Sequence, residues 1–174
     1  MSNFLLILSS LACQKLPTSN YQNTPSESSN KAHAEMFSKN GSKISGMVHF
    51  KENKEGLIVH YQINGFKKGK SYGFHIHENG DCSAQDAKSA GKHYMPIAPT
   101  GGTSLDSSQK HGGDLPQIEA THDGMNEGSF IVKEISLKEK NPILYKSIII
   151  HDGPDNIKKK SAPKIACGVI TETI

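Results

Sequence analysis

The chain has 174 residues, 34% of them hydrophobic, with 16 glycines, no tryptophan and a formal net charge of +3. This length suits one domain with a hydrophobic core and leaves little room for a second. The mild charge, without a basic helix or an interleaved aromatic array, argues against a nucleic-acid-binding protein.

Residues 1–12, MSNFLLILSSLA, resemble a secretory signal peptide that lacks the usual positive start. Cys13 follows Ser-Leu-Ala, as in the processing site of bacterial lipoproteins, with Ser10 where leucine is usual. Acylation of Cys13 would anchor the chain to a membrane by its lipid. The alternatives are ordinary cleavage near this point, or a start codon placed too late. The sequence therefore predicts an exported protein, either periplasmic or a membrane-anchored lipoprotein.

The segment 13–31 is polar and rich in proline, serine and asparagine, which predicts a flexible tether. A folded domain is expected over 32–174. If Cys13 is a processing site, Cys82 and Cys167 remain as a pair, and disulfides persist in an oxidising compartment. A disulfide closing so long a loop would stabilise the fold by about 4 kcal/mol.

From residue 32 onward, short apolar segments alternate with clusters of turn residues, which is typical of β-strands. No window keeps a helical period with caps at both ends. We therefore predict an all-β domain, an eight-stranded antiparallel β-sandwich or barrel. The expected strands are 32–38, 43–50, 56–64, 71–78, 117–122, 128–135, 146–151 and 165–170.

Two long connections, 79–116 and 152–164, interrupt this pattern, and loops of such length in a compact domain are usually functional. Leading into the first of them, GFHIHENGDC (73–82) places His75 and His77 on one face of a strand and two apolar residues on the other. Two imidazoles on one face can bind a transition metal, although a half-buried strand with a polar face gives the same pattern. Further metal-binding side chains lie in or beside the connections: His93, His111, Asp114 and His151. The Asp155 carboxylate could accept a hydrogen bond from the N–H of one of these imidazoles.

The segments GFHIHENGDC, AGKHYMP, HGGDLP, SIIIHDGPD and ACGVI, in this order, resemble the copper/zinc superoxide dismutases, particularly the exported bacterial ones. The resemblance covers about 32–174. It implies a Greek-key barrel with copper as cofactor and superoxide as substrate, in a monomer or a homodimer. The implied copper ligands are His75, His77, His93 and His151, and the implied zinc ligands are His93, His111 and Asp114. It further implies a Cys82–Cys167 disulfide, an outer-sphere role for Asp155, and a catalytic role for His93, which would release copper on reduction and carry a proton.

Two positions depart from the family pattern. A further zinc-binding histidine of the bacterial pattern falls on Gly102, which leaves three zinc ligands, whereas structural zinc is almost always four-coordinate. Water or Asp106 could complete the site, or the site could be empty. The arginine that guides and docks superoxide is replaced by Lys164, which keeps the charge and loses the planar fork of donors.

The connection before Lys164 carries Lys158, Lys159 and Lys160. These lysines could form a patch that steers a small anion, or they could belong to an ordinary solvated loop. Two functions therefore compete. The first is a copper-dependent superoxide dismutase. The alternative is a copper-binding or copper-buffering protein with little turnover, supported by Gly102 and Lys164. The histidines outside the motifs are expected to be ordinary surface residues: His33, His49, His60 and His122.

Overall fold

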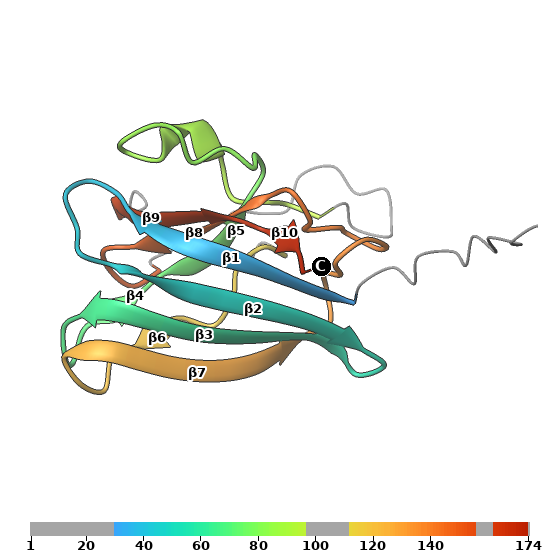
Figure 1. The fold of residues 1–174 in the computed structure, drawn as a ribbon, viewed down its shortest axis with the longest axis horizontal. Coiled ribbons are helices and arrows are strands. Elements are labelled where there is room, and N and C mark those ends of the chain that lie inside the picture. Colours follow the sequence, from blue (N-terminus) through green and yellow to red (C-terminus); the bar gives the residue numbers. More distant parts are fainter. Residues whose placement is uncertain (1–29, 97–111, 156–161, 174) are drawn as a thin grey trace, which may run out of the picture.

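The computed structural model describes residues 30–96, 112–155 and 162–173. The expected signal peptide, Cys13 and nearly all of the expected tether lie outside these ranges. The described part is an antiparallel all-β fold, which confirms the predicted fold class (Figure 1). No helix in the described ranges is long and apolar enough to cross a membrane.

Strands β1 to β3 form from the segments with the clearest period of two. They span Lys31–Ser38, Ser45–Asn53 and Gly56–Phe66. Residues that alternate along each strand are buried, such as Ala32 and Ala34 in β1 and Leu57 and Val59 in β3. Because side chains alternate across a strand, the residues between them face outward.

The main sheet has eight strands in the order β5-β8-β9-β1-β2-β3-β7, and β10 pairs with β1. β1 thus lies between its sequence neighbour β2 and the C-terminal β9. The sheet curls around one core that draws side chains from both halves of the chain (Figure 1). The remaining strands are β4 (Ser71–Tyr72), β5 (Phe74–His77), β6 (Ile118–Glu119), β7 (Gly124–Val132), β8 (Ser147–His151), β9 (Lys164–Val169) and β10 (Thr171–Glu172).

The single strand predicted over 71–78 is wrong, because the chain breaks at Gly73 into two strands of different sheets. β4 pairs with β6, whereas β5 pairs with β8. The Gly73 N–H donates to the Gly153 carbonyl at 2.8 Å, and its own carbonyl accepts from the His151 N–H at 2.9 Å. A Cβ at this position would lie 2.5 Å from Asp155 Oδ1, so only glycine allows so close an approach.

Other strand bounds also differ from the prediction. The strand expected over 117–122 shrinks to the two residues that pair with β4, and the one expected over 128–135 begins at Gly124 and ends at Val132. β10 was not expected at all. These differences arise where pairing with a distant strand, and not local alternation, decides the bounds.

The first long connection contains a short 3-10 helix, η1 (Lys88–Ala90), and is fastened to β9 by the Cys82–Cys167 disulfide. The predicted disulfide is therefore confirmed. Ala87, Ala90 and Ile149 pack around Cys167 in a second, smaller buried cluster. The connection is thereby held against the outward face of β8 and β9, beside the strand that carries His75 and His77.

Candidate metal centre

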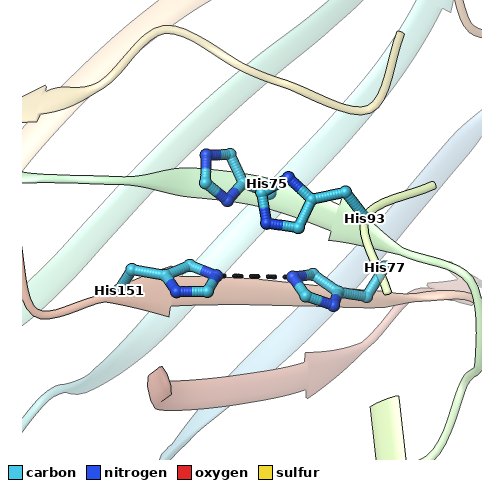
Figure 2. A group of neighbouring side chains, drawn as sticks. All are labelled: His75, His77, His93 and His151. Atoms are coloured by element: carbon cyan, nitrogen blue, oxygen red, sulfur yellow. Dashed lines mark hydrogen bonds between the residues drawn. The ribbon is translucent and has the colours of Figure 1, made fainter. Parts of the chain in front are cut away.

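Four histidines from three parts of the chain converge outside β5 and β8. His75 and His77 come from β5, His151 is the last residue of β8, and His93 comes from the long connection (Figure 2). One possible ligand atom from each lies within 4.8 Å of all the others. The three strand histidines are at most 2% exposed. The structure thus brings together the four predicted copper ligands.

The strand register explains how three of these imidazoles come to share a centre. His75 lies opposite Ile149 and His77 opposite Ser147, so the β5 imidazoles leave the core on the outward face of the sheet. The pairing of β8 with β9 shifts register between Ile150 and His151. Such irregularities re-aim a side chain beside a functional site, and here His151 faces the β5 pair.

His93 is positioned by backbone hydrogen bonds that extend the edge of the sheet. The Tyr94 N–H donates to the Ile76 carbonyl at 2.8 Å, and the Gly113 N–H donates to the Tyr94 carbonyl at 3.0 Å. His93 therefore lies opposite His77 in an isolated antiparallel bridge. A Cβ on Gly113 would lie 2.6 Å from the Tyr94 carbonyl oxygen, so glycine permits this close packing of loop on strand.

Backbone carbonyls set the tautomers of His77 and His151. His77 Nδ1 lies 3.0 Å from the Gly91 carbonyl, and His151 Nδ1 lies 2.7 Å from the Ala162 carbonyl. A carbonyl only accepts, so each Nδ1 carries the proton and each Nε2 presents a lone pair. These two Nε2 atoms lie 3.4 Å apart (Figure 2). Two lone pairs at this distance repel each other, and a cation between them would stabilise both.

His75 presents the opposite nitrogen. Asp155 Oδ1 lies 2.7 Å from His75 Nε2, off the direction of a well-aligned hydrogen bond, and its charge favours a proton on that nitrogen. Nδ1 is then left with its lone pair, and it is buried without a hydrogen-bond partner among the described residues. A buried polar atom left unsatisfied costs about 1–3 kcal/mol, and a metal ion would satisfy it.

Burial also keeps the imidazoles in their neutral form. It lowers the pKa of His77 from 6.5 to about 2, against a raising effect of the Gly91 hydrogen bond, and the positive charge of Lys164 lowers it further. Burial likewise lowers the pKa of His151 to about 4. Neutral imidazole is the form that binds metals, so His77 and His151 could bind a transition-metal ion without losing a proton at neutral pH.

Two of the three predicted zinc ligands also lie together. His93 Nδ1 lies 3.1 Å from Asp114 Oδ1, and these side chains are 23% and 17% exposed. His93 thus faces Asp114 with one nitrogen and offers the other to the four-histidine cluster. His111, Gly102 and Asp106 lie outside the described residues, so the rest of the predicted zinc site stays a prediction.

Lys164 begins β9 opposite His151, beside the cluster. Its Nζ donates to the Gly91 carbonyl at 2.8 Å and to the Ala87 carbonyl at 3.1 Å. Burial lowers the pKa of Lys164, and the nearby Asp86 and Glu78 carboxylates oppose this shift. The Gly91 carbonyl therefore contacts both a cluster histidine and this ammonium group.

The backbone carbonyls of Gly91, Ala162 and Ala87 were not predicted from the sequence, because every residue has a carbonyl and only the fold selects these three. The histidines expected to be surface residues lie outside the cluster. Lys158, Lys159 and Lys160 fall outside the described ranges.

Comparisons with known proteins agree with this geometry. The family model for "Copper/zinc superoxide dismutase (SODC)" matches residues 44–170. The chain is 33% identical over 149 residues to copper/zinc superoxide dismutase 2 of Aquifex aeolicus, covering 80% of this chain and 86% of that protein. It is 33% identical over 141 residues to the copper/zinc superoxide dismutase of Yarrowia lipolytica, covering 74% and 90%. A crystal structure of a double mutant of a SOD-like protein from Bacillus subtilis matches with a TM-score of 0.66 at 33% identity, covering 78% and 94%.

Proposed function

Because the chain belongs to the copper/zinc superoxide dismutase family, we propose that it converts superoxide to dioxygen and hydrogen peroxide. The observation that carries this proposal is the convergence of four histidine nitrogens within 4.8 Å, three of them on buried side chains. Copper bound there would supply the one-electron redox chemistry that oxidises one superoxide and reduces the next, which zinc cannot do.

The proposed copper ligands are His75 through Nδ1, His77 and His151 through Nε2, and His93. The hydrogen bonds to Gly91 and Ala162 support the nitrogen assigned to His77 and to His151. The contact with Asp155 supports Nδ1 of His75. Asp155 acts as a positioning residue, since it holds the imidazole through the nitrogen that faces away from the ligand position.

His93 is the proposed proton carrier. Its Nδ1 contacts the Asp114 carboxylate, and its other nitrogen belongs to the ligand cluster. A proton held on that second nitrogen would lie beside the position of bound substrate and could pass to the peroxide product. The incoming proton would be drawn from water, to which the His93 side chain is 23% exposed.

For zinc we propose an incomplete site of His93, His111 and Asp114, with no ligand from Gly102. The contact between His93 and Asp114 supports two of these ligands. Elemental analysis of the purified oxidised protein should give close to one copper per chain and clearly less zinc than copper. A full equivalent of zinc would contradict the missing-ligand reading of Gly102.

We propose Lys164 as the group that attracts superoxide to the centre. Its ammonium is fixed by two backbone carbonyls next to His77, so a positive charge stands at the cluster at low conformational cost. Lysine is a point charge, so attraction should persist while orientation of the anion is weaker than with arginine.

The disulfide supports export, because such bonds persist in oxidising compartments. We therefore propose a periplasmic or membrane-anchored lipoprotein attached through Cys13. Membrane fractionation of cells that produce the full chain should place it with the membranes, and Cys13→Ala should release it. If the unmodified chain and Cys13→Ala both stayed with the membranes, or if both were released, lipid attachment at this residue would be contradicted.

The central test measures copper and activity together. Copper-loaded protein should dismutate superoxide, and His75→Ala or His151→Ala should lose both bound copper and activity. Retention of tight copper binding by both variants would refute the site. Tight copper binding by the unmodified protein with negligible dismutation would instead identify a copper-buffering protein.

A further inference from the structure

Three histidines outside the metal centre form a row across the outward face of β1, β2 and β3. His33 lies directly opposite His49, and His49 lies directly opposite His60. The residues that flank each of them along its strand are buried or partly buried, so alternation turns the three imidazoles to the solvent side. These strands carry none of the four histidines of the candidate metal centre.

Two of these imidazoles already lie close together, and a carboxylate adjoins them. The rings of His49 and His60 are stacked with centroids 6.3 Å apart. His60 Nε2 lies 2.9 Å from Glu127 Oε1, on the neighbouring strand β7. For comparison, the rings of His75 and His77, which share the candidate metal centre, have centroids 6.4 Å apart. The spacing of the surface pair is therefore compatible with one shared ion.

We propose that His49, His60 and Glu127 form a second metal site that binds a divalent first-row transition ion at the surface of the sheet. Two imidazoles and a carboxylate suit copper(II) and zinc, and the Irving–Williams order makes copper(II) the tightest. The hydrogen bond with His60 lowers the pKa of Glu127 below its ordinary value, which keeps this carboxylate in its anionic, ligating form.

Binding requires these side chains to turn toward one another, because among the described residues only the four-histidine centre already has its donor atoms gathered. The side chains of His60 and Glu127 are 34% and 56% exposed, and His49 is also exposed, so solvent is available to the side chains that must turn toward the ion. Water would fill the remaining positions of the ion, and His33, next in the row, offers a further imidazole. This site would let the protein hold an ion without using the four-histidine centre, and it does not depend on the proposed catalytic function.

The test uses the untagged, oxidised full chain with its copper centre first loaded, then titrated with Cu²⁺ and followed by electron paramagnetic resonance. The unmodified protein should bind about one more copper(II) per chain than His49→Gln/His60→Gln, with an additional signal that this double variant lacks. His122→Gln is the matched control, since His122 is also exposed, its imidazole contacts the Thr121 hydroxyl, and it lies outside the row. It should keep the extra ion.

Glu127→Gln should weaken the extra copper at least about tenfold, because even partners of metal ligands typically matter that much. Dismutase activity and the far-ultraviolet spectrum should be the same in all of these variants, which shows that they are folded. Equal copper stoichiometry and affinity in the unmodified protein and His49→Gln/His60→Gln would overturn the proposal. Loss of the extra ion in His122→Gln as well would overturn it too, because binding would then not depend on the row.

Discussion

Acidification should destabilise the metal-free protein strongly, because two histidines of the cluster are neutral in the fold. The pKa values of His77 and His151 are lowered from 6.5 to about 2 and about 4, mainly by burial. Below pH 6.5 these two imidazoles therefore bind protons in the unfolded chain but stay neutral in the folded chain. The stability that these two neutral histidines contribute is fully present above their pKa in the unfolded chain, and it is lost as the pH falls below that value.

The magnitude follows from the linkage relation. Each histidine costs about 1.4 kcal/mol per pH unit once the pH lies below 6.5, so at about pH 5 each contributes a loss of about 2 kcal/mol. Together His77 and His151 should lower the free energy of unfolding by about 4 kcal/mol between about pH 7.5 and pH 5. Carboxyl groups contribute little here, because most titrate below this range.

Urea unfolding of the chelator-treated, oxidised protein at several pH values in this range measures the effect. The matched variant is His77→Gln/His151→Gln, which keeps polar side chains of similar size but cannot titrate. Its free energy of unfolding should change much less over the same range. A change below about 1 kcal/mol in the unmodified protein, or equal slopes in both proteins, would refute the reasoning.

Three further predictions concern the supports of the centre. Cys82→Ser/Cys167→Ser should lower the free energy of unfolding by about 4–5 kcal/mol, since the bond joins residues 85 apart in sequence; an unchanged urea midpoint would contradict this. Asp155→Asn should weaken copper binding at least about tenfold in a chelator competition, because it removes the charge beside His75 Nε2, whereas unaltered affinity would exclude the positioning role. Lys164→Met should lower kcat/KM and flatten its dependence on ionic strength, while the control Lys39→Met, at a lysine that bonds to the Cys82 carbonyl, should change neither. Equal salt dependence in both variants would exclude steering by Lys164.

Much of the fold could be predicted because period-two alternation is local. The segments of β1, β2 and β3 show it within a few residues, so their existence and inward faces follow from the sequence. The break at Gly73 could not be found this way, because the residues on both sides look like one strand. It depends on Gly153 and His151, which the fold brings to Gly73 from far along the chain.

The candidate site also has features that the sequence predicts and features that it does not. Its side chains were predicted, since imidazoles, carboxylates and cysteines are visible in the sequence and occur in a characteristic order. The tautomers were not, because they depend on carbonyls that the fold selects. The row of His33, His49 and His60 was missed for a related reason: each looks like an isolated surface histidine, and only the register between strands places them opposite one another.

The Gly91 carbonyl links the two parts of the proposed mechanism. It accepts hydrogen bonds from His77 Nδ1 and from Lys164 Nζ, so one peptide group orients a proposed metal ligand and positions the ammonium group proposed to attract the anion. Gly91 belongs to the connection that the Cys82–Cys167 disulfide fastens to β9, the strand that begins with Lys164. The bond therefore joins the two elements whose separation would release both interactions. We therefore expect the disulfide to hold the proposed ligand and the proposed steering charge in place, in addition to stabilising the domain.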